Sequence, residues 1–213
     1  MKRIVLALSI ALLPAASQAA TGVFGSYVGI NPDGAGNSWY GTQEWGANNI
    51  QDFQGANLGT FNWSTSDTLQ ISAFQVQTFK NVGEGDDVTG IELQYRVYKT
   101  GNTPGSFNVV GGGFLADSPF ASAAGNTASG FGDQNWGVNP TATLGNLMAG
   151  IDSAAENGNY TVEIFYRAFT NRGDRYSNNG GANYTANFTA IPEPGSMLLA
   201  SVGLLGLIAR RKR

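Results

Sequence analysis

The chain has 213 residues, contains neither cysteine nor histidine, and carries twelve basic against fifteen acidic side chains. Without cysteine and histidine, Cys-His and Ser-His-Asp nucleophilic sites and ordinary zinc sites are excluded. Six basic residues and one acidic residue lie in the two termini, so residues 20–190 hold six basic against fourteen acidic side chains, a net charge of −8. A domain this acidic is repelled by phosphate backbones, which argues against nucleic acid as a partner.

The first 19 residues have the layout of a secretory signal peptide. Lys2 and Arg3 form a positive start, an apolar run follows over residues 4–13, and small residues precede the expected cleavage site between Ala19 and Ala20. An uncleaved anchor is the alternative. It is disfavoured because an apolar run this short does not span a hydrocarbon core of about 30 Å.

Residues 20–190 are predicted to form a single extracytoplasmic domain of strands and turns. The clearest strands are VTGIELQYRVYKTG (88–101) and NYTVEIFYRAFT (159–170), in which apolar and polar side chains alternate with a period of two. Shorter strands are expected at Val23–Ile30, Leu58–Trp63, Thr68–Lys80, Ser106–Leu115 and Tyr184–Thr189, with turns at 31–37, 83–87, 100–105 and 171–174. The best helical candidate is Leu144–Ala155, which Gly145 and Gly150 weaken. The pattern predicts an all-β fold, an antiparallel β-sandwich.

The C-terminal segment IPEPGSMLLASVGLLGLIARRKR (191–213) has a different character. Residues 195–209 hold no charge, and the chain closes with Arg210, Arg211, Lys212 and Arg213. Fifteen residues make about 22 Å of helix, and the terminal cations can snorkel to the headgroups and extend this span. The run is apolar all round, which disfavours an amphipathic helix. A short transmembrane helix is predicted, with its basic end in the cytoplasm and the domain outside.

The order Pro192-Glu193-Pro194, apolar helix and basic end closely resembles the PEP-CTERM sorting signal of Gram-negative bacteria that make exopolysaccharide. The resemblance implies recognition of Pro192, Glu193 and Pro194 by an integral-membrane exosortase, while Arg210–Arg213 hold the tail in the inner membrane. Two prolines keep the motif extended, which suits a protease cleft. The stretches GANLGTFNWSTSDTLQI, DDVTGIELQYRVYKTGNTPGSF and NGNYTVEIFYRAFT also resemble an uncharacterised β-domain of secreted bacterial proteins, to which no activity is assigned.

Aromatic residues suggest one possible binding site within the domain. Trp39, Tyr40, Trp45 and Trp136 are candidate contacts for a glycan, because amphipathic rings stack on sugars. The alternative is that these rings belong to the core of the sandwich.

Carboxylates suggest two further chemistries. Asp33, Asp86 and Asp87 lie in oxygen-rich turns and are weak candidates for a structural Ca²⁺ site, although Asx-turns explain both turns without a metal. A glycosidase needs two carboxylates; Asp86, Asp87, Glu92, Asp117, Asp133 and Glu163 are available, and spacing singles out no pair.

The sequence favours a non-enzymatic exported protein, sorted by exosortase to the cell surface or extracellular matrix. Its expected partner is exopolysaccharide of a biofilm or another matrix protein. The alternative is a carbohydrate-binding module with a defined glycan ligand, and a carboxylate glycosidase is a third, less favoured hypothesis. No cofactor is expected beyond the calcium considered above.

Overall fold

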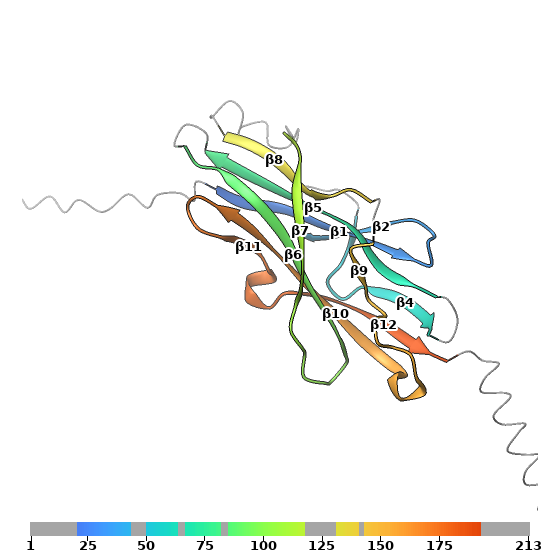
Figure 1. The fold of residues 1–213 in the computed structure, drawn as a ribbon. Coiled ribbons are helices and arrows are strands. Elements are labelled where there is room, and N and C mark those ends of the chain that lie inside the picture. The colour runs from blue at the N-terminus through green and yellow to red at the C-terminus, as the bar shows by residue number, and fades with distance from the viewer. Residues whose placement is uncertain are drawn as a thin grey trace, which may run out of the picture.

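The computed structural model describes residues 21–43, 50–63, 67–81, 85–117, 131–140 and 143–192, and within these ranges every long element is a strand (Figure 1). The all-β prediction is confirmed. The strands are β1 (Thr21–Pro32), β2 (Ser38–Gln43), β3 (Gln51–Asp52), β4 (Asn57–Asn62), β5 (Leu69–Asn81), β6 (Val88–Lys99), β7 (Asn108–Asp117), β8 (Phe131–Val138), β9 (Gly145–Asn146), β10 (Gly158–Thr170), β11 (Arg175–Ser177) and β12 (Tyr184–Ile191). Two short 3-10 turns lie at Ala154–Glu156 and Asn179–Gly181.

The strands form one curled sheet in the order β3-β2-β1-β5-β8-β7-β6-β10-β12-β4, with β9 beside β5 and β11 beside β10. Its two halves face each other. Sheet A comprises β3, β2, β1, β5, β8 and β9, and sheet B comprises β6, β10, β11, β12 and β4. Strand β7 belongs to both, because residues 108–112 pair with β6 and residues 113–117 pair with β8. The sandwich is therefore continuous along one side.

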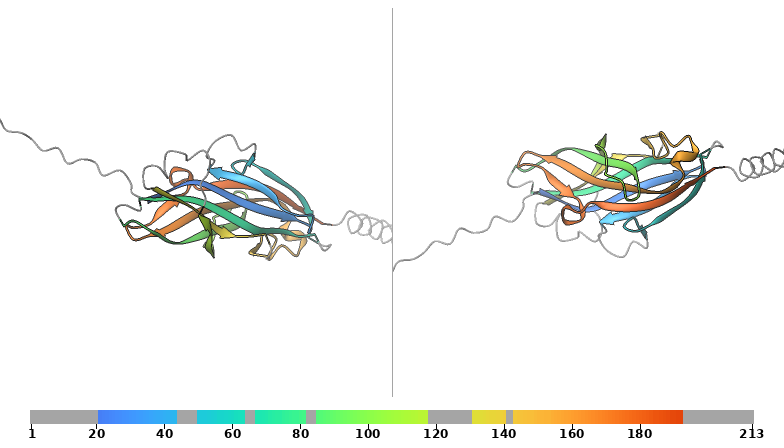
Figure 2. Two further views of the ribbon diagram at one scale, coloured as in Figure 1. Left: turned by 90° about the horizontal axis from the view of Figure 1, so that it is seen from above. Right: turned by 90° about the horizontal axis from the view of Figure 1, so that it is seen from below.

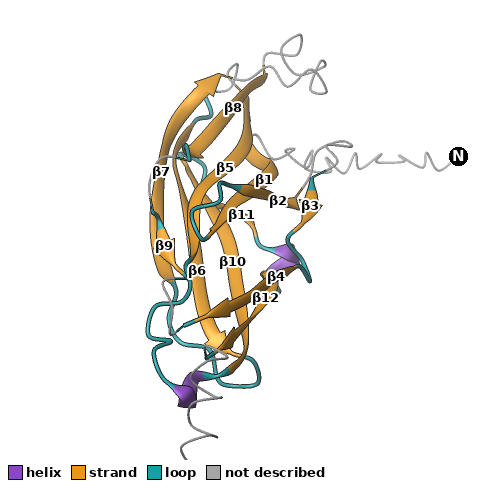
Figure 3. Cartoon of the chain, turned by 90° about the vertical axis from the view of Figure 1, so that its right-hand side faces the viewer, coloured by secondary structure: helices purple, strands orange, loops and turns teal. Residues whose placement is uncertain are grey.

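On the opposite side of the sandwich, residues 53–56 connect β3 of sheet A to β4 of sheet B. The Phe53 N–H donates to the Gly41 carbonyl of β2 (2.7 Å), and the Gly55 N–H donates to the Thr185 carbonyl of β12 (2.7 Å). The strands at this connection pair in parallel, β3 with β2 and β4 with β12, so the sheet is mixed rather than purely antiparallel. Figure 3 shows β7 along one edge and β2 and β3 toward the other. The sandwich thus has a strand, β7, at one of its closed sides and the segment between β3 and β4 at the other.

The core lies between the two sheets and is built from alternate residues of each strand. The inward faces predicted for β6 and β10 are confirmed, since Ile91, Leu93 and Ile164 are at most 2% exposed. Phe74 of β5 packs against Tyr166 of β10, with ring centroids 6.2 Å apart. Because the inward residues of both sheets are apolar, burial of this surface drives the two halves together.

One glycine makes the crossing of β7 possible. An ideal Cβ on Gly112 would lie 2.7 Å from the Phe74 ring, 2.8 Å from an Ile91 methyl and 2.9 Å from Gly137 Cα. No side chain fits there. The glycine run of β7 thus lets the strand pass close over the core as it changes sheets.

The weak helical prediction over Leu144–Ala155 is wrong. Gly145 and Asn146 form β9 and pair with Ile71 and Gln70 of β5. A Cβ on Gly145 would lie 2.4 Å from the Tyr95 hydroxyl, and Gly150 has a φ of +79°. The first glycine allows a close approach to β6, and the second has a left-handed backbone that a helix does not use.

The chain enters and leaves the domain at opposite ends (Figure 2). Strand β10 runs between them. At one end of β10, the Thr170 hydroxyl lies 3.4 Å from the hydroxyl of Thr21, where β1 begins. At the other end, Gly158 pairs with Ala190, near the end of β12. Strand β12 therefore ends at the end of the domain opposite to Thr21.

Candidate functional site

The last strand runs directly into the predicted sorting segment. Strand β12 ends at Ile191, whose carbonyl accepts a hydrogen bond from the Trp63 N–H (3.2 Å), and Pro192 follows it, half-buried. Glu193, Pro194 and the basic cluster of residues 210–213 lie outside the described residues, as do Ala19 and Ala20. In the described part of the chain, no helix has the length and apolar character needed to cross a membrane. The helix predicted at 195–209 lies outside that part.

Two of the four candidate glycan contacts are buried. Tyr40 is 7% exposed and packs edge-on against Phe53, and Trp136 is 8% exposed and packs edge-on against Phe114 of β7. Both rings therefore belong to the core of the sandwich, the alternative that the sequence left open for them. Trp39 is half-buried on β2 opposite Gly29, and Trp45 lies outside the described residues.

Asp33 lies far from the other two calcium candidates, the neighbours Asp86 and Asp87, and all three have protein partners. Asp33 follows β1 and accepts the Thr68 N–H (2.6 Å). Asp86 and Asp87 precede β6 at the opposite end of the domain, where they pair with Arg172 (2.5 Å) and Lys80 (2.7 Å). The described residues contain no group of three or more acidic side chains able to hold a metal ion. A hydrogen bond or an ion pair engages one oxygen of each of these carboxylates.

Two of the glycosidase candidates are also occupied. Glu163 accepts hydrogen bonds from Arg96 Nε (2.9 Å), Arg96 Nη2 (2.8 Å), the Tyr98 hydroxyl (3.3 Å) and Asn183 Nδ2 (2.6 Å). Glu92 accepts from Gln94 (2.5 Å) and Arg167 (3.5 Å). Protein donors thus fix the orientation of both carboxylates. Asp133 is buried on β8, and the side chain of Asp117 lies outside the described residues.

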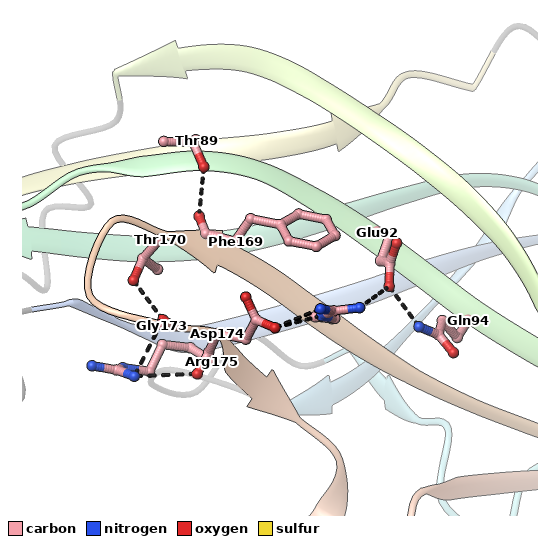
Figure 4. A network of polar contacts seen from close by, with 9 residues as sticks. Thr89, Glu92, Gln94, Phe169, Thr170, Gly173, Asp174 and Arg175 are labelled. Atoms are coloured by element: carbon pink, nitrogen blue, oxygen red, sulfur yellow. Dashed lines mark hydrogen bonds and ion pairs between the residues drawn. The ribbon is translucent and has the colours of Figure 1, made fainter.

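These contacts belong to a larger arrangement on the outer face of sheet B, here called the arginine lattice: Glu92, Arg96, Glu163, Arg167 and Asp174. The Arg167 guanidinium lies between Asp174 (2.5 Å) and Glu92 (3.5 Å), a cluster drawn in Figure 4. The sequence predicted a polar outer face here. It did not predict the lattice, because Asp174 reaches Arg167 only through the turn between β10 and β11.

Aromatic rings cover the arginines of this lattice. The Arg96 guanidinium lies 4.2 Å from the centroid of Phe107, and that of Arg167 lies 4.6 Å from the centroid of Phe169. Phe165 stands edge-on to Phe107 at 5.0 Å. Stacking and ion pairing together satisfy both cations. The two arginines of this face are therefore paired with carboxylates and aromatic rings of the protein itself.

Ionisation on and near this face is shifted away from neutral pH. Burial, together with the Glu163 carboxylate, raises the pKa of the Tyr98 phenol. Burial and a hydrogen bond to Glu156 raise the pKa of Tyr160 to about 12. The hydrogen bond to Asp174 raises the pKa of Arg167. These shifts favour phenols that are neutral and an arginine that is charged at neutral pH.

A hollow of about 280 Å³ opens beside the turn between β1 and β2. It is lined by Asn31, Gly36, Asn37, Gln70, Ser72, Pro140 and Thr143. None of these described lining residues is ionisable. The hollow lies toward the end of the domain where β12 ends, because Asn31 stands at the end of β1 opposite to Thr21.

The fold and its C-terminal end define a class of protein: an all-β domain joined without a linker to a short terminal segment. Residues 190–213 match the PEP-CTERM protein-sorting motif, which confirms the resemblance of the tail. This motif marks an exported, surface-targeted protein that is processed by an exosortase, a membrane protein. No curated protein matches the chain significantly.

Proposed function

We propose that the protein is a non-enzymatic component of the cell surface or extracellular matrix, and that its β-domain associates with exopolysaccharide. The observation that carries the proposal is the position of the sorting motif, which begins at Ala190, inside the last strand of the domain. Because no second domain lies between β12 and the motif, the β-domain is itself the cargo that sorting delivers.

The proposed route begins with export. A signal peptide over residues 1–19 is cleaved between Ala19 and Ala20. The apolar tail then holds the chain in the inner membrane of a Gram-negative cell, with Arg210–Arg213 in the cytoplasm. Exosortase recognises Pro192, Glu193 and Pro194, and the β-domain is released to the surface.

The chemistry of the domain supports a binding role rather than catalysis. The chain has no histidine or cysteine, and the carboxylates of Glu92 and Glu163 are occupied by protein donors. The acidic net charge disfavours attraction to an anionic polymer. Contact with a polysaccharide would therefore run through neutral polar groups. Another matrix protein is the alternative partner.

Cell fractionation tests this proposal. In cells with a functional exosortase and normal exopolysaccharide, we expect the protein in the surface and matrix fraction. In cells that cannot make exopolysaccharide, we expect it to be lost from that fraction into the medium. Retention at the surface without exopolysaccharide would point to a protein partner, and turnover of a glycan by the purified protein would contradict the non-enzymatic role.

A further inference from the structure

We propose that the hollow beside the β1–β2 turn binds a neutral sugar unit, held by the carboxamide NH₂ groups of Asn31, Asn37 and Gln70. This inference rests on the proposed association with polysaccharide, and it assigns the contact to one place on the domain.

Segments far apart in the sequence build the hollow. Asn31 and Asn37 flank the β1–β2 turn, Gln70 and Ser72 come from β5, and Thr143 precedes β9. Ser72 is buried, and its hydroxyl lies 3.2 Å from the Gly29 carbonyl of β1. Because β1 and β5 are paired along their length, the hollow rests on two strands of the sandwich and is pre-formed.

Each of the three carboxamides has its oxygen engaged by the protein. Asn31 Oδ1 accepts the Gly36 N–H (3.3 Å), Asn37 Oδ1 accepts from the Ser72 hydroxyl, and Gln70 Oε1 accepts from the Thr143 hydroxyl (3.1 Å). These bonds fix the orientation of the amide planes. They involve only the oxygen of each carboxamide, so its NH₂ group can donate hydrogen bonds to a ligand.

The NH₂ groups make the hollow rich in hydrogen-bond donors. Across the described ranges, Asn31 Nδ2, Asn37 Nδ2 and Gln70 Nε2 donate to no protein acceptor. An amide NH₂ has two N–H donors. A matching ligand must therefore offer several acceptor oxygens in a small volume, as the hydroxyl and ring oxygens of a sugar do.

Charge narrows the class of ligand further. No lysine or arginine is among the described lining residues, and Asp33, which is exposed in the same turn, adds a negative charge nearby. An anionic ligand would meet no counter-ion here. An apolar ligand would desolvate the amides without replacing their hydrogen bonds. A neutral polyhydroxylated ligand avoids both costs.

Trp39 extends the site on the same side of the sheet. It lies two residues after Asn37 and pairs with Gly29, whose carbonyl contacts the Ser72 hydroxyl. Gly29 lies two residues before Asn31 in β1, and residues two apart in a strand share one face. The half-buried indole is thus placed to contact a sugar that occupies the hollow, as amphipathic rings commonly do.

The arginine lattice is less suited than the hollow to binding a ligand. Its charged groups are paired within the protein, so a ligand there would have to compete with existing ion pairs. The NH₂ groups of the hollow have no such competitor. The most exposed ring beside the lattice is Tyr176, which is 49% exposed, and it provides a matched test of the alternative surface.

The test uses the full chain in dodecylphosphocholine, a detergent without a sugar headgroup. Saturation-transfer NMR and calorimetric titration are made with methyl glycosides of glucose, galactose, mannose and N-acetylglucosamine, and with glucuronate. The variants Asn37→Asp and Gln70→Glu keep the shape and the accepting oxygen but replace the NH₂ group. Tyr176→Ala and Asn102→Ala, an exposed amide in the β6–β7 turn, are the controls.

We expect at least one neutral glycoside to bind, and each of the two hollow variants to weaken its affinity about tenfold, the effect of one lost hydrogen bond. The two controls should bind as the wild type does. Binding that is unchanged in both hollow variants, binding lost in Tyr176→Ala instead, binding of glucuronate alone, or binding of none of the probes would overturn the proposal.

The same variants separate this inference from the proposed function. If Asn37→Asp and Gln70→Glu remain in the matrix fraction as the wild type does, the hollow is not the contact and the association with exopolysaccharide stands. If the wild type itself is not retained by exopolysaccharide, the proposed function fails, whatever the methyl glycosides show.

Discussion

Arg96 of β6 and Glu163 of β10 are direct cross-strand partners and form a two-pronged ion pair, with Nε–Oε2 at 2.9 Å and Nη2–Oε1 at 2.8 Å. The side chain of Glu163 is only 8% exposed, and it accepts from Tyr98 and Asn183 as well. One carboxylate thus links β6 and β10 to the loop before β12. Removing its charge should therefore weaken the contacts that join β6, β10 and this loop.

The first prediction concerns this carboxylate. Glu163→Gln should lower the free energy of unfolding by about 2 kcal/mol, because the half-buried Arg96 loses its counter-ion. The matched control is Asp87→Asn, which breaks the more exposed pair with Lys80 and should cost less than about 1 kcal/mol. Urea denaturation measures both. Equal losses in the two variants would contradict a structural role specific to Glu163.

The second prediction concerns alkaline pH. The pKa of Tyr160 is raised from its ordinary value near 10 to about 12, first by burial and then by the Glu156 carboxylate. Its stabilising contribution is complete below pH 10 and is lost as pH rises toward 12, because the folded state holds a proton that the unfolded state releases.

Tyr160→Phe isolates this contribution. Urea denaturation at several pH values between 8 and 12 should give the variant a shallower decline than the wild type, by up to about 1.4 kcal/mol per pH unit for one proton. At pH 8 the variant should be the less stable protein, because it lacks the hydrogen bond from the hydroxyl to the Glu156 carbonyl (2.7 Å). Parallel declines would show that Tyr160 does not titrate as described.

The third prediction concerns a chain of buried hydroxyls between the two sheets. The Ser177 hydroxyl of β11 lies 2.8 Å from that of Ser26 on β1 and 3.1 Å from that of Tyr184 on β12. Ser177→Ala leaves both neighbours without this partner, and should cost about 1–3 kcal/mol. Thr89→Ala removes an exposed hydroxyl that donates to the Phe169 carbonyl, and should change stability by less than about 0.5 kcal/mol. A Ser177 variant as stable as the Thr89 variant would show that the chain of hydroxyls does not hold the sheets together.

The fourth prediction concerns how close to the domain the tail can be removed. A chain that ends at Pro192 keeps all of β12 and should unfold with the stability of the intact domain. A chain that ends at Asn187 loses Phe188 and Ala190, both at most 1% exposed, and its stability should fall by more than about 4 kcal/mol. Thermal unfolding of the two truncated chains distinguishes them. Similar stabilities would mean that the end of β12 does not contribute to the core.

The sequence predicts best the strands in which apolar and polar side chains alternate. In β6 and β10 one face meets the core and the other meets solvent, so the period of two is visible in the residues themselves. Strand β8 was missed because its segment FGDQNWGV is rich in residues typical of turns, although Trp136 lies in the core. The parallel pairing of β4 with β12 joins segments as far apart in sequence as Asn57 and Asn187, and no local pattern encodes it.

The hydrogen-bond partners within the candidate site could not be predicted from the local sequence either. The turn at 31–37 was singled out for its oxygen atoms as possible ligands for calcium. In the structure the oxygen of Asn31 is engaged by the Gly36 N–H, and that of Asn37 by Ser72 of β5. The hydrogen bond from Ser72 to Asn37 joins residues more than thirty positions apart, so the sequence of the turn alone cannot predict it. Sorting, by contrast, was predictable because its motif is contiguous.

The most direct test of the account is the intact mass of the protein recovered from the cell surface or medium, with and without a functional exosortase. We expect a mature species that begins at Ala20 and ends near Pro192–Pro194, and that is absent when the exosortase is absent. A species that retains Arg213 in the membrane fraction under both conditions would contradict it, and the protein would then be a membrane-tethered β-domain that is not processed.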